Sequence, residues 1–300
     1  MYPTLYHFFF STFGFELEFL RYFNSFGLLV ALAFLIAKFV FSLEIKRKTN
    51  LGLLKQEKGN PSPQEHVGVI LLIAIVFGFL GAKIFAWLEN PIPLVEFFRD
   101  PFSGLTIYGG LILAFFVSFF YLKWYKMPVL HFMDAVAPAL MLAYGIGRLG
   151  CHVSGDGDWG IINNTPVPKW IPNWLWSYNY PHNVLGEGVP IPNCIYNDYC
   201  FQLLQPVYPT PLYETIFSVL FFLILWKLRT KVKIAGQLFF IYLIFNGVER
   251  FFIEKIRVND TYNIIGWEIT QAEIISVAFI GIGIVGFLGL KEKRNRLKIN

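Results

Sequence analysis

Charged residues are scarce in this sequence. Asp, Glu, Lys and Arg together make up 15% of its 300 residues, whereas hydrophobic residues make up 55% and the mean hydropathy is positive. A soluble domain of this length normally carries about 25% charged residues. The scarcity therefore argues against a soluble globular protein and favours a chain with several membrane-spanning segments.

Seven mainly apolar stretches support this interpretation, because each approaches the roughly 20 residues that an α-helix needs to cross a bilayer core. They lie near residues 21–43, 67–89, 104–125, 131–150, 211–228, 235–253 and 270–290. A soluble α/β enzyme with buried strands would explain one such stretch but explains seven of them poorly. We therefore predict an all-α polytopic membrane protein with about seven transmembrane helices, forming a single membrane-embedded domain over residues 1–300.

A cleavable signal peptide is not expected, because the first apolar stretch is too long and its strongest positive cluster follows it. Lys and Arg recur after the first, third, fifth and seventh stretches. These residues are Lys46, Arg47, Lys48, Lys55, Lys58, Lys123, Lys126, Lys227, Arg229, Lys231 and Lys233, followed by the basic tail at 291–300. The positive-inside rule makes these segments cytoplasmic, with the N-terminus outside and the C-terminus inside. The net charge of +5 then reflects topology and anionic lipid, and needs no nucleic-acid partner.

The same orientation places residues 90–103, 151–210 and 254–269 outside. Segment 151–210 is rich in Trp, Pro, Asn and Tyr, as in VPKWIPNWLWSYNYPHN, a composition typical of the membrane interface. We predict that this segment forms a small external cap between the fourth and fifth helices. Cys194 and Cys200 both lie in it, and the sequence is compatible with a disulfide or with two separate thiols.

Polar residues inside membrane segments are costly to bury, so their depth is informative. Under the predicted topology, one set of them lies near the outer ends of different helices. This set comprises Lys83, Tyr108, Arg148, Glu214, Arg250 and Glu254. Lys83 by itself could simply extend to the interface, but the gathering of the whole set at one face predicts a site on the outer-leaflet side.

Arg148 is the member of this set that is hardest to explain as a structural residue. Arg250 and Glu254 are one helical turn apart and could neutralise each other. No acid lies four residues from Arg148 on its own helix, although Asp156 and Asp158 follow the helix end. Two arginines at head-group depth favour recognition of a phosphate, whose oxygens match the donors of a guanidinium group. We therefore expect a phospholipid head group to bind there.

The stretch GRLGCHVSGDGDWG at 147–160 resembles the signature of the prolipoprotein diacylglyceryl transferase family. That signature reads Gly-Arg-(hydrophobic)-Gly-Asn-Phe-(hydrophobic)-Asn-Gly-Glu, followed by an aromatic residue and a glycine. Further segments resemble this family in the same order. They are SFGLLVAL (25–32), GAKIFAWL (81–88), YGGLI (108–112), YPTPLYE (208–214) and RFFIEKIR (250–257). The predicted seven-helix topology with an external N-terminus also agrees with the family.

The resemblance implies an enzyme of the bacterial inner membrane. Such enzymes transfer the diacylglyceryl group of phosphatidylglycerol to the lipobox cysteine in the signal peptide of a prolipoprotein, and release glycerol phosphate. Because the nucleophile belongs to the substrate, no enzymic Ser or Cys is needed. The sequence shows no metal-ligand cluster or nucleotide-binding loop, so we expect no cofactor and no metal.

Site residues are carried over from the resemblance position by position. Arg148 and Arg250 would bind and stabilise the phosphate. Asp156 would replace the signature glutamate, and Glu254 would be the acid that follows the second arginine. The other segments supply the remaining residues expected to bind substrate, which are Lys83, Gly109, Gly110, Tyr208 and Glu214.

The chain departs from the family pattern at positions that bear on proton transfer. Tyr108 stands where the family has a histidine often assigned as the base, and Tyr208 replaces a second family histidine. A neutral tyrosine, with a pKa of about 10, is a poor base at neutral pH but can donate a hydrogen bond. Three interpretations stay open: His152 accepts the thiol proton, Glu254 or Asp156 accepts it, or the arginine charges acidify the thiol without a dedicated base.

Two other functions also stay open. One is a lipid or small-anion transporter that uses the same arginines, and the other is a family member that binds lipid but has lost catalysis. No internal repeat is visible and the charges favour one face, which weakens the transporter. Cys151, next to the signature arginine, is compatible with a reactive thiol or with a small packing residue.

Overall fold

A computed structural model describes residues 1–56, 59–91, 99, 106–196, 198–259, 261–264 and 267–299. The helices are α1 (Leu5–Phe13), η1 (Glu18–Tyr22), α2 (Ser25–Asn50), α3 (Pro63–Glu89), α5 (Ile107–Trp124), α6 (Val129–Ser154), α7 (Asn173–Trp176), α8 (Thr210–Leu228), α9 (Gln237–Glu254) and α10 (Gln271–Ile299). The strands are β1 (Val189–Pro190), β2 (Phe201–Gln202), β3 (Thr261–Ile264) and β4 (Trp267–Thr270). The chain divides into a larger unit, residues 1–37 with 137–300, and a smaller unit, residues 38–136.

Each of the seven predicted apolar stretches coincides with a helix, and the all-α membrane class is confirmed. Among the described residues, six helices are long and apolar enough to cross a membrane: α2, α3, α5, α6, α8 and α10. α9 differs because its 18 residues include Glu249, Arg250 and Glu254, whose charges lower its apolar character. The count of seven spans and the N-outside topology stay predictions, and most of the loop predicted at 90–103 lies outside the described residues.

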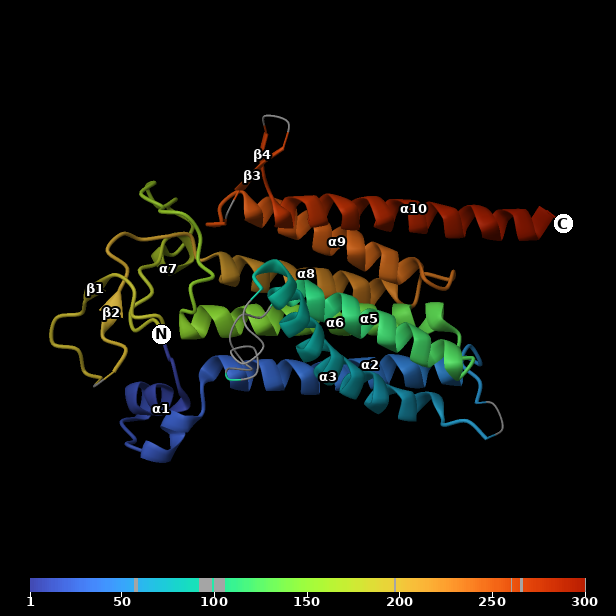
Figure 1. The fold of residues 1–300 in the computed structure, drawn as a ribbon, viewed down its shortest axis with the longest axis horizontal. Helices are drawn as coiled ribbons and strands as arrows, with labels where there is room; N and C mark the ends of the chain where they lie inside the picture. Colours follow the sequence, from blue (N-terminus) through green and yellow to red (C-terminus); the bar gives the residue numbers. More distant parts are fainter. Residues whose placement is uncertain are drawn as a thin grey trace. The chain divides into compact units, whose positions relative to one another are not determined.

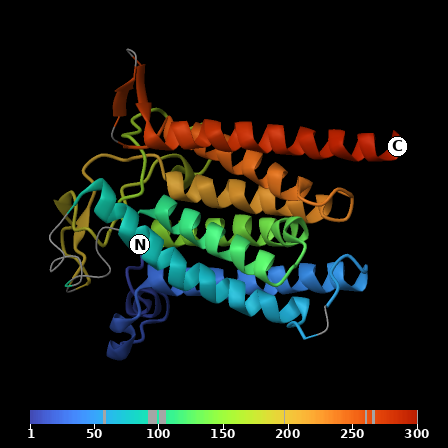
Figure 2. The ribbon, with the colours of Figure 1, turned by 45° about the vertical axis from the view of Figure 1, so that its right-hand side comes forward.

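In the larger unit, α8, α9 and α10 run side by side with the end of α6, and segment 155–209 lies at one end of them (Figures 1 and 2). Met141 of α6, Leu225 of α8 and Leu238 of α9 form a buried apolar cluster. Closer to the end of α6, Gly145 faces Ser218 of α8, where an added Cβ would lie 2.8 Å from the serine Cβ. The glycine therefore permits the close approach of α6 and α8.

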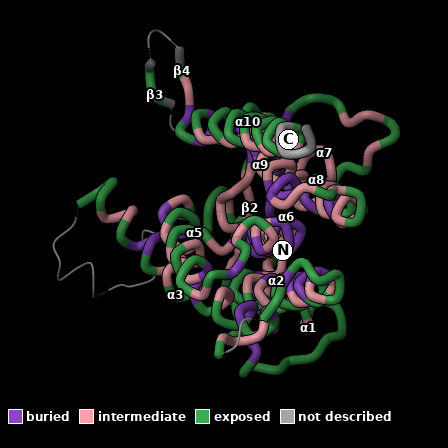
Figure 3. Tube along the Cα trace, turned by 90° about the vertical axis from the view of Figure 1, so that its right-hand side faces the viewer, coloured by how far each residue is buried: buried purple, intermediate pink, exposed green. Residues whose placement is uncertain are grey.

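Burial differs sharply between helices. Half of the α6 span is buried, against 17% of the α10 span (Figure 3). The exposed apolar side chains of α10 suit contact with lipid tails, since a membrane helix need not bury its apolar surface against protein. The polar side chains of α6 are enclosed instead, and this enclosure sets the environment of Arg148.

The smaller unit contains α3 and α5, which lie side by side (Figure 2). A Cβ added to Gly109 would lie 2.5 Å from the Gly81 carbonyl oxygen, and one added to Gly110 would lie 2.6 Å from that of Gly78. Side chains at these positions would force the two helices apart, so the glycines make this helix contact possible. Lys83 of α3 is buried within this unit.

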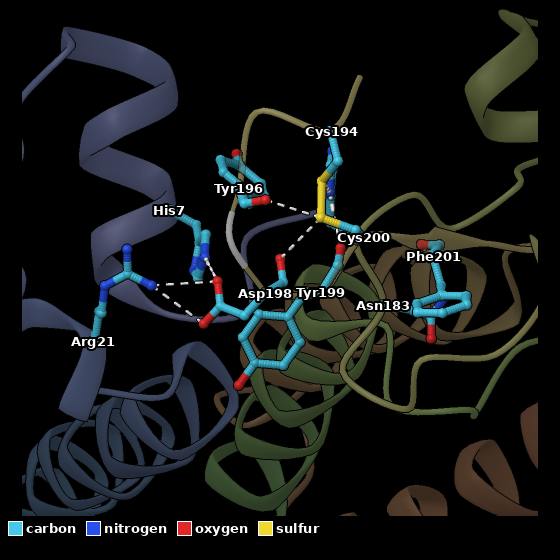
Figure 4. Close-up of a disulfide and its surroundings, with 10 residues drawn as sticks. His7, Arg21, Asn183, Cys194, Tyr196, Asp198, Tyr199, Cys200 and Phe201 are labelled. Atoms are coloured by element: carbon cyan, nitrogen blue, oxygen red, sulfur yellow. Dashed lines mark hydrogen bonds and ion pairs between the residues drawn. A yellow bond between two sulfur atoms is a disulfide. The ribbon is translucent and has the colours of Figure 1, made fainter. Parts of the chain in front are cut away.

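The described residues of segment 155–209 are non-helical apart from α7, and β1 pairs with β2 in an antiparallel ladder. Within it, Cys194 and Cys200 form a disulfide, with 5.7 Å between their Cα atoms. Asp198, in the loop that this disulfide closes, accepts hydrogen bonds from Arg21 and lies 3.0 Å from His7 Nε2 (Figure 4). The N-terminal segment is thus fastened to the disulfide loop. The external location of this cap stays a prediction.

Candidate functional site

Glu214 is the centre of the charged site in the larger unit. It lies in the first turns of α8, where its side chain is fully buried. Its Oε2 forms an ion pair with Arg148 Nε, and its Oε1 accepts from Arg257 Nη1 at 3.2 Å and from Arg250 Nη1 at 3.5 Å. A buried carboxylate requires such cationic donors to offset the loss of its hydration. Three arginines therefore converge on one carboxylate, and we call Arg148, Arg250 and Arg257 the arginine cluster.

Asp158 makes a second link between members of the arginine cluster. Its Oδ2 accepts from Arg148 and its Oδ1 accepts from Arg257, so that both arginines bridge Asp158 and Glu214. Burial alone would raise the pKa of Asp158, but the charges of Arg148 and Arg257 outweigh it and lower that pKa below its usual value. Asp158 is therefore an anion that belongs to the site.

Arg250 also pairs within its own helix. Its Nη2 lies 3.3 Å from Glu254 Oε2, one turn further along α9, and Asn259 donates to the other oxygen of Glu254 at 2.5 Å. The mutual neutralisation of Arg250 and Glu254 considered from the sequence is thus present. It coexists with the contact between Arg250 and Glu214, because the guanidinium group has several donors.

The chain after α6 turns sharply to bring Asp158 to the arginine cluster. Gly155 and Gly157 both have positive φ, +66° and +97°, which residues with a side chain rarely adopt. Beyond them, Gly160 N donates to the Tyr208 carbonyl at 2.8 Å and Ile161 N donates to the Ile256 carbonyl at 2.9 Å. This backbone pairing holds the signature stretch against the segment that carries Arg257.

Asp156 has a different environment from Asp158. Its Oδ1 accepts from the backbone N–H of Asp158 at 3.3 Å, and its burial raises its pKa above the usual value. Of the two aspartates, Asp158 is the one bonded to the arginine cluster, and the sequence interpretation named it only as a possible partner of Arg148. The assignment of Asp156 to the signature glutamate stays a prediction.

His152 and Tyr208 lie among aromatic side chains. His152 Nδ1 is 3.2 Å from Tyr180 Oη, and its ring packs against Tyr178 and Tyr180. The Tyr208 ring packs edge-on against Trp176, while its backbone accepts the bond from Gly160. Both residues are in the larger unit, and their predicted roles in proton transfer and substrate binding stay predictions.

Four predicted residues belong to the smaller unit. They are Lys83, Tyr108, Gly109 and Gly110. The two glycines form the contact between α3 and α5, Lys83 is buried, and Tyr108 is partly exposed. Their participation in the site with the arginine cluster stays a prediction.

Sequence reasoning missed Arg257, Tyr144 and Glu249. Arg257 is the last residue of the RFFIEKIR segment, so the resemblance to the family already pointed to it. Tyr144 lies one helical turn before Arg148 and therefore on the same face of α6. Its Oη is 3.0 Å from Glu214 Oε2 and 3.3 Å from Glu249 Oε2. Glu249 lies outside the short motifs that carry the resemblance in the sequence, one residue before RFFIEKIR.

One group of side chains has the spacing of a metal site. The Cys151 sulfur and one oxygen each of Asp156 and Asp158 lie within 4.8 Å of one another. Both oxygens of Asp158 already accept from arginines, whose positive charges oppose a second cation. These residues fit a metal ion poorly. Cys151 is buried in the last turns of α6 and forms no disulfide.

The fold and this site define a multi-pass membrane protein that holds clustered guanidinium groups in a buried, carboxylate-rich setting. The model of the prolipoprotein diacylglyceryl transferase family matches residues 13–288, and the chain belongs to this family. The resemblance noted in the sequence is therefore confirmed.

Similar proteins carry the name phosphatidylglycerol–prolipoprotein diacylglyceryl transferase. One from Leptospira interrogans is 30% identical over 267 residues, which cover 79% of this chain and 72% of that protein. One from Staphylococcus haemolyticus is 28% identical over 87% of this chain and 81% of its own length. The transferase 1 of Clostridium perfringens is 28% identical over 92% of this chain and 94% of its own length. The similarity to each of these proteins thus covers most of the chain.

Proposed function

We propose that this protein transfers the diacylglyceryl group of phosphatidylglycerol to the lipobox cysteine thiol of a prolipoprotein and releases glycerol phosphate. Family membership and the names of the relatives support this activity. The observation that carries it is the convergence of Arg148, Arg250 and Arg257 on the buried Glu214. Guanidinium groups held in this way are suited to grip a phosphate and to stabilise it as it leaves.

The products define the bonds that change. The cysteine sulfur attacks the glycerol carbon that is bonded to the phosphate oxygen, so that a sulfur–carbon bond forms and a carbon–oxygen bond breaks. The electron pair of the broken bond leaves with the phosphate oxygen, and the proton lost by the thiol balances the charge of the released glycerol phosphate. Negative charge therefore grows on the phosphate, which the arginine cluster would stabilise.

The arginine donors are occupied by Glu214 and Asp158, so an incoming phosphate would compete with these carboxylates for them. The raised pKa of Asp156 supports this residue as an acceptor for the thiol proton, because a carboxylate with a higher pKa is a stronger base. Glu254, paired with Arg250, would hold that arginine in place. His152, Tyr108, Tyr208, Lys83, Gly109 and Gly110 complete the proposed substrate site as the resemblance implies.

We also propose that the protein lies in the bacterial inner membrane, with its site on the outer-leaflet side. The distribution of Lys and Arg along the chain supports this orientation. The Cys194–Cys200 disulfide supports it too, since segment 155–209 then faces an oxidising compartment. The signal peptide of the prolipoprotein would approach from the same side.

The direct test reconstitutes the full chain in vesicles with labelled phosphatidylglycerol and a lipobox peptide. We expect a thioether-linked diacylglyceryl peptide and an equal amount of glycerol phosphate. Arg148→Ala and Arg250→Ala should each abolish the product while the protein stays folded, and Arg229→Ala, beyond the far end of α8, serves as the matched control. Full activity in either cluster variant would contradict the assignment, and movement of lipid without thioether product would favour a transporter.

A further inference from the structure

Tyr144 lies between two buried carboxyl groups that come from different helices. Its hydroxyl oxygen is 3.0 Å from Glu214 of α8 and 3.3 Å from Glu249 of α9. Both carboxyl groups are almost inaccessible, with 0% and 5% of the residue exposed. A tyrosine hydroxyl has one proton, which gives one carboxyl group a full-strength hydrogen bond but is weakened when it is shared between two. For both contacts to be full-strength hydrogen bonds, one of the two carboxyl groups must carry a proton.

The surroundings of the two carboxyl groups identify the one that carries the proton. Glu214 forms ion pairs with all three members of the arginine cluster, which stabilises its charged form. Glu249 Oε1, in contrast, has no hydrogen-bond partner among the described residues. An ionised carboxylate with an unsatisfied oxygen is costly to bury. The proton therefore belongs on Glu249, which donates it to Tyr144, while Tyr144 donates to Glu214.

The charged and titratable neighbours of Glu249 agree with this arrangement. They are Tyr144 and Arg148 of α6, Glu214 of α8 and Arg250 of its own helix. The ion pairs of the two arginines are with Glu214, Asp158 and Glu254. On α10, which packs along α9, Glu273 is engaged by Lys255 and by the backbone of Thr270.

We propose that Glu249, Tyr144 and Glu214 form a proton relay that opens the arginine cluster to a phosphate. An anionic head group that binds there adds negative charge beside Glu214 and favours the neutral form of that carboxyl. Glu249 then passes its proton to Tyr144 as Tyr144 passes its own to Glu214. No electrons move and the net charge is unchanged. The negative charge shifts from Glu214 to Glu249, and the guanidinium donors that held Glu214 turn to the phosphate.

The identity of the phosphate rests on the proposed function, whereas the relay rests on the two contacts of Tyr144. Tyr144 and Glu249 both lie outside the segments that resemble the family, at 147–160, 208–214 and 250–257. The short motifs that carry the resemblance therefore did not point to the relay. Its role is to position Glu214 and its charge, not to touch the reacting atoms.

Infrared difference spectroscopy of the full chain tests the relay without any need for turnover. In phosphatidylcholine vesicles we expect a band from a protonated carboxyl group that Glu249→Gln removes. Phosphatidylglycerol in the vesicles should shift this band in the native protein, as the proton moves to Glu214. In Tyr144→Phe the band should remain but should no longer respond to phosphatidylglycerol. Tyr242→Phe, which removes a hydroxyl elsewhere on α9, should behave as the native protein does.

Kinetics supply the second measurement. Because the relay frees donors for the head group, Tyr144→Phe should raise KM for phosphatidylglycerol about tenfold, with kcat changed less than about twofold. Identical carboxyl bands in the native protein and Glu249→Gln would overturn the relay, and so would a normal lipid response in Tyr144→Phe. The band could also shift with phosphatidylglycerol in a protein that forms no thioether product. That result would support the relay and contradict the proposed function.

Discussion

Two groups of ion pairs in the larger unit are built on the same plan but in different surroundings. Asp158 holds two members of the arginine cluster, and Asp198 holds Arg21 and His7. Side-chain exposure is 9% for Arg148 and 30% for Asp158, against 26% for Arg21 and 44% for Asp198. Water therefore reaches Arg21 and Asp198 more readily than Arg148 and the fully buried Glu214, although His7 is itself buried. We therefore expect the enclosed pairing to serve the proposed binding site and the exposed pairing to hold the N-terminal segment in place.

Removal of the buried carboxylate should have the largest effect. Glu214→Gln leaves three guanidinium groups short of a counter-charge, and we expect a loss of about 3–5 kcal/mol in the free energy of unfolding. Chemical unfolding in detergent measures it. Glu18→Gln is the matched control, because Glu18 pairs with Arg21 while 70% of its side chain is exposed. Equal stabilities for the two variants would erase the contrast between the buried and exposed groups.

A substitution of Arg257 tests whether this residue, one of the three that sequence reasoning missed, belongs to the proposed site. Arg257→Lys keeps the charge but loses the forked donors that bridge Glu214 and Asp158. We expect kcat/KM for phosphatidylglycerol to fall about 100-fold. Arg21→Lys, at the exposed group, should change it less than about twofold, and a similar change in both variants would remove Arg257 from the site.

Removal of the Cys194–Cys200 disulfide should lower the stability of the protein by a moderate amount. Cys194 and Cys200 are six residues apart, and closing so short a loop stabilises a protein by about 2 kcal/mol through the unfolded chain. We expect Cys200→Ser, or reductant, to lower the thermal midpoint without abolishing transfer. Cys151→Ser provides the comparison, because this thiol is free. Complete loss of activity on reduction would tie the loop to catalysis.

The smallest expected effect is the pH dependence of stability that comes from His7, the partner of Asp198. Burial lowers the pKa of His7, and the nearby Asp198 only partly opposes this. The folded protein thus binds a proton at His7 less readily than the unfolded chain does. The stabilisation is complete above about pH 6.5 and is lost as the pH falls from there through the pKa of the folded state. We expect a change below about 1 kcal/mol in thermal melts, absent in His7→Gln. If His7→Gln showed the same dependence of the thermal midpoint on pH as the native protein, the assignment of this dependence to His7 would be contradicted.

The membrane helices could be predicted because their signal is local. An apolar stretch of sufficient length is enough to indicate a spanning helix, and the boundaries of α8 and α9 fall within two residues of the expected ones, whereas α2 extends seven residues further than expected. Successive membrane helices run in alternating directions, and this was enough to predict that Arg148, Glu214 and Arg250 lie at the same end of their helices. Their convergence in the structure follows from topology more than from any single motif.

The details of the site depended on backbone paths that composition does not reveal. Two aspartates follow α6, and only the turn through Gly155 and Gly157 decides that Asp158 meets the arginines. Arg257 lies beyond the end of α9 and reaches the site through the backbone pairing at Gly160. Glu249 precedes Arg250 by one residue and thus points about 100° away around the helix. Its partner on α6 becomes evident only once the helices are packed.

The bond between His7 and Asp198 spans 191 positions of the chain. α1 precedes the other described helices along the chain, yet its contact with Asp198 can form only after four of the long helices have been translated. We therefore expect α1 to complete its packing late, once the loop between Cys194 and Cys200 has been synthesised.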